Sequence, residues 1–401
     1  MFLPLLQRRN PELLRAAAAL HRSGALNPNT SVLDTDAIAR NARAIADEAQ
    51  RLGLDAFAMT KQIGRNPDAA QAVHAGGISH AVGVDLECAQ AAALAGLAIG
   101  HLGHLVQIPR RRIPEAAALE PLFWTVFSEA QARWAGQAAL AAGREQAVLV
   151  RIVAPGDRFY TGHEGGFPAA DVVRVARLVD SLPGVRFGGI TTFPATLFDG
   201  PSGDVVATPN RETLTRARDA LVAAGFSDFA VNAPGTTSTT TLAALAEAGA
   251  TQVEPGHGLT GTTPLHAVRD LVEDPAIAYV TEVSHLWNDR AYVYGGGLYV
   301  DPVLGIPETS ALLVREGEDP AGAVPLRVEM PAPESIDYYA SIPLDGMSVQ
   351  EGDTVIFGFR PQVFVTRGET AAIGGLSQGA PVLGEPFAAN GGSPVRLWGG
   401  R

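Results

Sequence analysis

Cysteine is almost absent from the sequence, which has a single one, Cys88, among 401 residues. One cysteine cannot form a disulfide within the chain, and it cannot build a thiolate metal cluster. Long apolar runs are missing as well. The longest, residues 91–100, is far shorter than the roughly 20 residues of a membrane-spanning helix. Residues 1–9 lack the features of a signal peptide, so we expect a soluble, cytoplasmic protein.

An excess of positive charge is also lacking, because the formal net charge is -12 at pH 7. Nucleic acids and anionic membrane surfaces repel such a protein, so we expect neither as a partner. Arg110, Arg111 and Arg112 form a short basic run after Pro109, which we interpret as a solvated loop. Any anion that the protein binds has to be held by local donors.

Short β-type runs alternate with helical patterns from about residue 35 to residue 262. This alternation predicts an α/β fold with a parallel sheet, and the number of strands favours a closed (β/α)₈ barrel over an open sheet. The expected strands are residues 56–60, 78–84, 99–105, 122–127, 147–153, 186–192, 228–232 and 251–254.

Beyond about residue 275 the helical periodicity disappears, and β-type runs are separated by Gly, Pro and Asp. This pattern predicts a second, all-β domain. We therefore divide the chain into an N-terminal helical segment (1–30), a barrel (31–268) and a C-terminal β domain (269–401).

Lys61 stands where the apolar run 56–60 gives way to a loop, at the expected C-terminal end of a barrel strand. Active sites of such barrels lie at this end, and an amine there is a candidate Schiff-base nucleophile. A lysine that only caps a strand end is the alternative interpretation.

The segment 231–240 follows one expected strand and opens a helix with small residues and threonines. Such a segment can hold a phosphate through backbone N–H groups, hydroxyls and the helix N-terminus. It can equally be a helix N-terminus whose hydroxyls cap the helix.

Glu254 ends the next expected strand and is followed by a glycine-rich loop at residues 256–261. A carboxylate at a strand end is often a cap or a salt-bridge partner. Together with Lys61 and the segment 231–240, however, it brings an amine, a phosphate-type loop and a carboxylate to one end of the barrel. Pyridoxal 5'-phosphate (PLP) needs all three, since the lysine binds its aldehyde, the loop its phosphate and the carboxylate its pyridine nitrogen.

The chain resembles fold-type III PLP enzymes of the alanine racemase group, and most closely their YhfX-like branch. The resemblance covers nearly the whole chain, and it implies a PLP-binding (β/α)₈ barrel of alanine racemase type followed by a C-terminal all-β domain. It also implies a homodimer in which each active site borrows groups from the partner's β domain. The motifs that carry the resemblance are residues 59–62, 64–67, 103–109, 232–234, 254–257, 260–263 and 357–362.

On this resemblance Lys61 matches the Schiff-base lysine, and Arg158 resembles an arginine that orients cofactor and substrate. His101 and His104 stand at another strand end, where they either touch the cofactor or pack. The cofactor-binding candidates besides Lys61 and Arg158 are Gly235, Thr236, Thr237, Glu254, Gly256 and His257.

In the β domain, Tyr294 lines up with the tyrosine that serves as acid/base on the opposite face of the substrate. Tyr292 is its rival on the same strand face, and both can instead pack in the domain core. His285 is a further acid/base candidate or a structural histidine. The substrate-binding candidates are Asp337, near the substrate carboxylate by resemblance, and Arg360, which is either a carboxylate ligand or a surface ion-pair partner.

Glu254 departs from the alanine racemases, which have arginine at that position. A carboxylate there favours a protonated pyridine nitrogen and thus a stronger electron sink. Decarboxylation, aldol cleavage and elimination therefore stay open beside racemisation. The histidine that stacks on the cofactor in racemases is replaced within residues 191–194, by Phe193.

Metal-dependent relatives carry a His/Cys or His/Asp pair near the C-terminus, whereas the last histidine here is His285. We therefore predict no catalytic metal. The resulting expectation is a PLP-dependent amino-acid racemase in which Lys61 and Tyr294 act on opposite faces of Cα. A PLP-dependent decarboxylase or carbon-lyase is the alternative. A non-catalytic PLP carrier is the third, which the β domain argues against because such relatives resemble the barrel alone.

Overall fold

The computed structural model describes residues 2–295, 309–331, 338–358, 360 and 368–388. The chain forms two compact units that do not follow the order of the sequence. The barrel unit comprises residues 42–60 and 73–258, and the β unit comprises residues 1–41, 61–72 and 259–401. No helix in the described ranges has both the length and the apolar character needed to cross a membrane.

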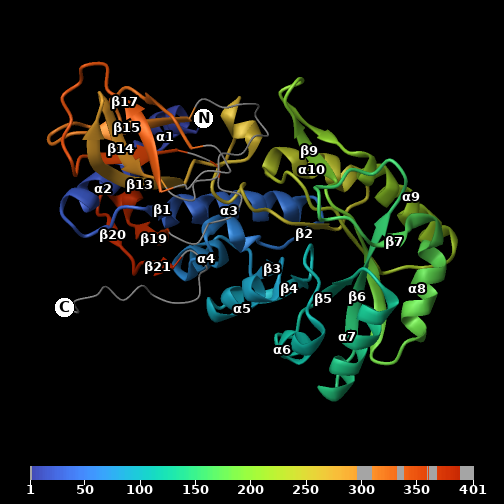
Figure 1. Ribbon diagram of the computed structural model, residues 1–401. Helices are drawn as coiled ribbons and strands as arrows, with labels where there is room; N and C mark the ends of the chain where they lie inside the picture. Colours follow the sequence, from blue (N-terminus) through green and yellow to red (C-terminus); the bar gives the residue numbers. More distant parts are fainter. Residues whose placement is uncertain (1, 296–308, 332–337, 359, 361–367, 389–401) are drawn as a thin grey trace. The chain divides into compact units, whose positions relative to one another are not determined.

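The barrel unit is built on one parallel sheet (Figure 1). A parallel bridge between Ala58 and Ala81 joins the two ends of this sheet, so that the barrel is nearly closed. This confirms the predicted alanine racemase-type barrel. The strands along the sheet are β2 (Asp55–Ala56), β12 (Gln252–Val253), β11 (Ala230–Asn232), β8 (Val185–Thr191), β6 (Gln146–Val153), β5 (Phe123–Val126), β4 (Ala98–Leu102) and β3 (His80–Gly83).

Helices cover the outer side of this sheet with apolar faces. In α8 (Val172–Ser181), the buried residues Val172, Val175, Ala176 and Val179 recur with the period of one helix face. The other helices are α5 (Leu86–Leu94), α6 (Ile113–Ala118), α7 (Glu129–Ala141), α9 (Pro209–Ala223) and α10 (Thr239–Glu247), while α3 (Thr35–Arg51) and α4 (Pro67–Ala75) cross the division between the units. A hairpin of β9 (Thr196–Asp199) and β10 (Asp204–Ala207) follows β8.

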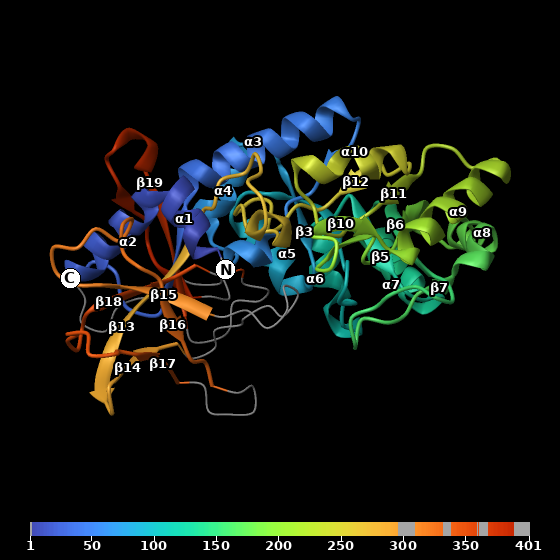
Figure 2. The same cartoon turned by 90° about the horizontal axis from the view of Figure 1, so that it is seen from above.

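The β unit contains the predicted all-β fold. Its strand β1 (Thr30–Asp34) comes before the barrel in sequence, yet it pairs with β13 (Ile277–Trp287) and β19 (Glu369–Gly374). Figure 2 shows β13 beside β14 (Arg290–Tyr294) and β17 (Tyr339–Pro343). The remaining strands are β15 (Thr309–Val314), β16 (Leu326–Val328), β18 (Thr354–Phe357), β20 (Val382–Leu383) and β21 (Phe387–Ala388).

Two N-terminal helices, α1 (Leu3–Arg9) and α2 (Pro11–Arg22), pack on the sheet of the β unit. Leu13 and Leu14 of α2 are fully buried in one core with Val280 and Ile356. Burying side chains of this size stabilises the unit by roughly 1.5–3 kcal/mol each.

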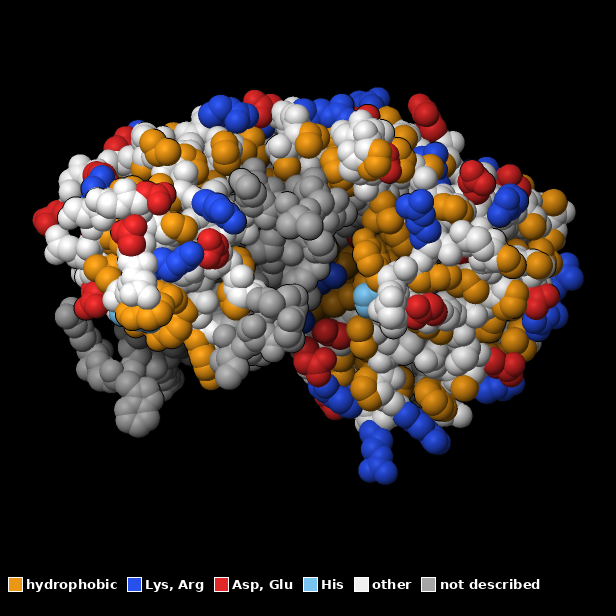
Figure 3. All heavy atoms as spheres, turned by 45° about the horizontal axis from the view of Figure 1, so that its top comes forward, with side chains coloured by type: hydrophobic (Ala, Val, Ile, Leu, Met, Phe, Trp, Pro, Cys, Tyr) orange, Lys and Arg blue, Asp and Glu red, His pale blue; other side chains and the backbone are white. Residues whose placement is uncertain are grey.

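On the face drawn in Figure 3, Lys and Arg side chains are interspersed with Asp and Glu side chains.

Candidate active site

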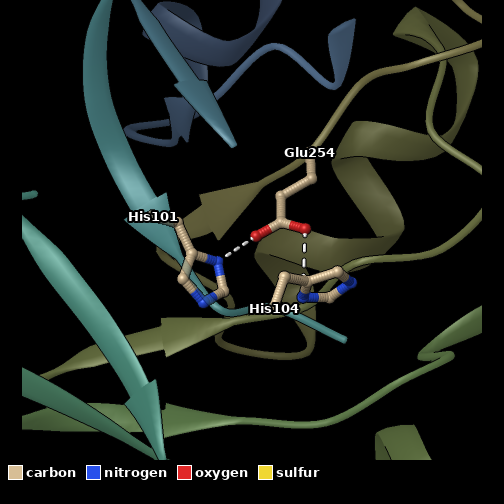
Figure 4. Close-up of side chains that lie close together, drawn as sticks. All are labelled: His101, His104 and Glu254. Carbon is tan, nitrogen blue, oxygen red and sulfur yellow. Dashed lines mark hydrogen bonds and ion pairs between the residues drawn. The ribbon is translucent and has the colours of Figure 1, made fainter. Parts of the chain in front are cut away.

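A buried carboxylate between two imidazoles lies at the C-terminal end of the barrel strands (Figure 4). Glu254 follows β12 directly, and its side chain is 1% exposed. His101, on β4, places Nδ1 at 2.5 Å from Glu254 Oε1. His104 follows the end of β4 and places Nδ1 at 3.3 Å from Glu254 Oε2. Both imidazoles therefore point at the same carboxylate from one strand and the turn after it.

Further side chains from neighbouring strands hold this group in place. Asn232, the last residue of β11, donates from Nδ2 to Glu254 Oε1 over 2.9 Å. The hydroxyl of Thr191, the last residue of β8, donates in turn to Asn232 Oδ1 over 2.7 Å. His101 Nε2 pairs with the hydroxyl of Thr125 on β5. Glu254 Oε1 is thus fixed by two partners, whereas Oε2 accepts no hydrogen bond from any described residue.

The surroundings keep Glu254 ionised despite its burial. Burial, the largest single influence, raises its pKa, but the charges of His104 and His101 and the hydrogen bonds from His101 and Asn232 outweigh it. Together they lower the pKa of Glu254 to about 2. The site therefore holds a carboxylate at neutral pH, with one oxygen still able to accept a proton donor from a ligand.

Lys61 lies in a short 3₁₀ helix, Thr60–Ile63, and is half-buried. The strand predicted over residues 56–60 is shorter in the structure, where β2 ends at Ala56 and the chain continues with the bridge at Ala58. The backbone N–H of Met59 donates to the carbonyl of Pro255 over 2.8 Å. The backbone at Met59, two residues before Lys61, therefore runs beside Pro255, the residue that follows Glu254.

The composition contains a signal for Lys61 that the motif pattern alone does not give. Lys61 is the only lysine among the 401 residues, and the rest of the 30 residues counted as Lys or Arg are arginines. Arginine replaces lysine well as a surface charge, but it cannot become a neutral primary amine near neutral pH. A single lysine in an arginine-rich chain therefore supports the prediction that this amine has a specific chemical use.

The segment 231–240 provides evidence for the capping interpretation without excluding the other. Ser238 and Thr241 form a capping box at the start of α10. At Gly235 a side chain would have no room, because its β-carbon would lie 2.6 Å from the backbone oxygen of Thr196. Thr237 donates its hydroxyl to the carbonyl of Gly235 over 3.2 Å. Several of these groups thus have structural tasks.

The two glycine-rich loops predicted at this end of the barrel lie side by side. A β-carbon at Gly258 would lie 2.6 Å from the carbonyl oxygen of Thr237. His257 is buried, and so is Gly256, whereas Thr236 is half-buried. The structure therefore brings the loop after β11 and the loop after β12 together, as binding of one phosphate by both would require.

Two arginines, one on β6 and one in the loop after it, have different surroundings. Arg158 has an exposed side chain, and its backbone N–H and C=O both bond to Asn210, at 2.8 and 3.0 Å. Arg151, on β6, is 1% exposed and was not among the predicted site residues. The signal for it is an arginine inside the apolar run 148–152, where a charge is rare.

The acid/base candidates of the β unit gather in one aromatic cluster. His285 stacks on Tyr292 with ring centroids 4.6 Å apart, and it meets Tyr339 edge-on at 5.2 Å. Tyr294 lies 5.6 Å from the ring of Tyr339. This arrangement suits packing as well as chemistry, so the choice among these residues stays a prediction. Arg360 is buried, and Asp337 lies outside the described residues.

His101, His104 and Glu254 also have the geometry of a metal-binding group, since their ligand atoms lie within 4.8 Å of one another. The predicted absence of a catalytic metal stays a prediction. The same residues fit PLP well, because Glu254 Oε2 is a buried anionic oxygen that has His104 Nδ1 at 3.3 Å but accepts no hydrogen bond among the described residues. Glu254 would hold the pyridine nitrogen, and Lys61 would hold the aldehyde carbon.

Comparison with known proteins identifies the class. Residues 33–264 match the family "Alanine racemase, N-terminal domain", and residues 278–383 match "YhfX-like, C-terminal domain". The chain belongs to the alanine racemase family of fold-type III PLP enzymes. Within it, the chain is 36% identical over 383 residues to "Uncharacterized protein YhfX" of Escherichia coli K12, a match that covers 96% of this chain and 97% of the relative.

Solved structures with the same fold differ in the reaction that their names state. D-threonine aldolase from Filomicrobium marinum matches with a TM-score of 0.63 at 19% identity, covering 91% of this chain and 95% of that one. Alanine racemase from Clostridium difficile 630 matches with 0.63 at 15% identity, covering 90% and 98%. D-threo-3-hydroxyaspartate dehydratase from Delftia sp. HT23 matches with 0.64 at 18% identity, covering 93% and 98%. At these identities the likeness shows the fold alone.

Proposed function

We propose that the protein is a PLP-dependent enzyme that acts at Cα of an amino acid, and that its reaction is racemisation. The observations that support the proposal are a single lysine in the whole chain and a buried, ionised Glu254 directly after a barrel strand. These are the two groups that the cofactor needs at opposite ends of its ring.

The cofactor, when bound, supplies electron withdrawal that makes the Cα hydrogen acidic. Glu254 would hold the ring nitrogen of the cofactor and favour its protonated form, while His101 and Asn232 hold one oxygen of this carboxylate. Lys61 would hold the cofactor and move the Cα proton on one face of the substrate. Tyr294, supplied by the partner subunit of a homodimer, would supply a proton on the other face.

Lyase chemistry is the second candidate, and one observation favours it. The buried carboxylate with a pKa of about 2 would keep the ring nitrogen of a bound cofactor protonated, which makes the ring a stronger electron sink than racemisation requires. A stronger electron sink would also support cleavage of another bond at Cα in place of the bond to hydrogen. Cleavage of the bond from Cα to the carboxyl or to a side-chain carbon is therefore the alternative reaction of the same site.

An amino-acid panel in deuterated water separates these reactions. Full-length protein is incubated with L- and D-amino acids, and the products are followed by NMR and chiral chromatography. Deuterium at Cα together with loss of chirality supports racemisation, whereas carbon dioxide, an aldehyde or a keto acid supports lyase chemistry. A protein that binds PLP but neither exchanges nor breaks a bond at Cα in any substrate would instead support the third interpretation, a carrier.

A further inference from the structure

Arg151 is among the largest fully buried side chains of the described residues, and the opposite charge that acts on it is that of Glu164. Nη2 donates to the carbonyl of His163 over 2.5 Å. Nε and Nη1 are buried and make no hydrogen bond within the described part of the chain. Buried polar groups nearly always have partners, and an unpaired buried charge is among the most expensive features that a fold can contain.

The surroundings of Arg151 are apolar on the sides that the structure describes. The guanidinium carbon lies 4.6 Å from the ring centre of Phe127 and 6.0 Å from that of Phe159. Burial lowers the pKa of Arg151 to about 10, and the charge of Glu164 offsets part of this effect. The side chain therefore stays cationic at neutral pH in a setting where an anion would be bound strongly.

Arg151 faces the same end of the barrel as Glu254. It is the register partner of Thr191 on β8, and residues paired in a parallel sheet point to the same face. The hydroxyl of Thr191 bonds to Asn232, which in turn holds Glu254. The barrel interior thus has an anion on β12 and, on β6, a cation with open hydrogen-bonding capacity.

A series of contacts between aromatic rings also runs from the surroundings of Glu254 to those of Arg151. His104, beside Glu254, meets Phe193 edge-on with ring centroids 5.3 Å apart. Phe193 lies 5.8 Å from Tyr160, which lies 6.1 Å from His163. The carbonyl of His163 is the group bonded to Arg151. A small ligand seated among these rings would have a cation within reach on one side and an anion on the other.

We propose that Arg151 binds a carboxylate of the amino-acid ligand at this end of the barrel. The proposal rests on the proposed function for the identity of the ligand, although not for the presence of an anion-binding group. A guanidinium with unused N–H groups matches a carboxylate, and the rings that flank it exclude water. The carboxylate is either the one on Cα or a second one on the side chain of the substrate.

The loop after β6 has to make room for such a ligand, because it covers Arg151. This loop has glycines with positive φ at Gly156, Gly162, Gly165 and Gly166, at 92, 86, 122 and 135°. Other residues rarely adopt these conformations, so the loop has several points at which its path can change. Entry of a carboxylate would replace the bond from Arg151 to the carbonyl of His163 with a charge-assisted one.

Calorimetric titration of the full-length protein with four probes tests the proposal. Aspartate has two carboxylates, asparagine and alanine have one on Cα, and alaninamide has none. In Arg151→Met we expect affinity for a carboxylate that Arg151 binds to fall roughly 10- to 100-fold, and affinity for alaninamide to stay unchanged. Loss with aspartate alone assigns the side-chain carboxylate, whereas equal loss with aspartate, asparagine and alanine assigns the one on Cα.

Arg144→Met is the matched control. Arg144 also has a buried Nε without a hydrogen bond among the described residues, but its other nitrogens bond to Gln146 and to the carbonyl of Ala117. We expect its affinities to match those of the wild type. Arg151→Lys should recover only part of the lost affinity, because lysine keeps the positive charge but lacks the planar pair of N–H donors of a guanidinium.

Two results would overturn the proposal. One is carboxylate binding that is absent in the PLP-loaded wild type or equally tight in Arg151→Met. The other is a loss of PLP in Arg151→Met with ligand affinity unchanged, which would assign the arginine to the cofactor. If the wild type fails to take up PLP, the proposed function fails. Succinate then serves as the probe of the cofactor-free protein, and binding that is lost in Arg151→Met would still support the arginine's role.

Discussion

Glu254 and Arg151 are both buried charges inside one barrel, but their surroundings differ. Glu254 has imidazoles and an amide directed at it from three neighbouring segments, which lower its pKa to about 2. Arg151 has one carbonyl and two apolar rings, and burial lowers its pKa to about 10. The first charge is stabilised by hydrogen bonds within the fold, whereas the second has two nitrogens, Nε and Nη1, without a hydrogen bond among the described residues.

The difference separates two kinds of functional group. A supported charge is already in the state that it needs before a ligand arrives, and such preorganisation is the main electrostatic contribution of an enzyme. An unsupported charge gains most of its stabilisation from the ligand. Removing support from Glu254 should therefore reduce stability, whereas removing Arg151 should reduce binding.

Substitution of His101 should have the largest effect on stability. His101→Phe keeps a ring of similar size but leaves the Glu254 carboxylate without its shortest partner, and breaking a buried charge pair destabilises by about 3–5 kcal/mol. Urea unfolding of the full-length protein measures the change. His104→Phe is the control and should destabilise less, because its contact with Oε2 is longer, at 3.3 Å. Equal losses of stability in the two variants would contradict the larger contribution that we assign to His101.

The pH dependence of stability should follow Glu254. Its pKa falls from the ordinary value of 4.5 to about 2 on folding, so its contribution is fully present above pH 4.5 and is lost as the pH falls towards 2. The difference corresponds to about 3 kcal/mol. Urea midpoints of the wild type and of Glu254→Gln, measured between pH 6 and pH 3, should converge on acidification. Parallel curves would show that folding does not lower the pKa of Glu254.

Substitution of Arg151 should have the smallest effect on stability. Arg151→Met removes a buried charge that has one hydrogen bond, and replacing such charges by apolar groups is often neutral or stabilising. We expect a free energy of unfolding within about 1 kcal/mol of the wild type, or above it. A loss comparable to that in His101→Phe would make Arg151 a structural residue and erase the contrast with Glu254.

The barrel could be predicted from the sequence because its signal is local: apolar runs and helical periodicity alternate along the chain. The place of β1 could not, since β1 pairs with β19, more than 300 residues away, and nothing in residues 30–34 specifies that partner. Glu254 could be identified as a strand-end carboxylate. Its bond to Asn232 depends on the lateral neighbourhood of β11 and β12, and its bond to His101 depends on the closure of the barrel.

Arg151 was missed for a different reason. Its neighbours in sequence are apolar, so the run is typical of a buried strand, and a motif-based search concentrates on loops. Only the structure shows that Nε and Nη1 lack partners among the described residues. Lys61 shows the opposite case, because a count of lysines supports it more directly than any motif does.

Reductive trapping tests the central claim most directly. The protein is loaded with PLP, reduced with borohydride and digested, and the peptides are analysed by mass spectrometry. Because Lys61 is the only lysine, only the α-amino group competes with it for the aldehyde. The account predicts a pyridoxyl group on Lys61 in the wild type and none in Lys61→Arg. A wild-type protein with unmodified Lys61 after saturation with PLP would contradict the account.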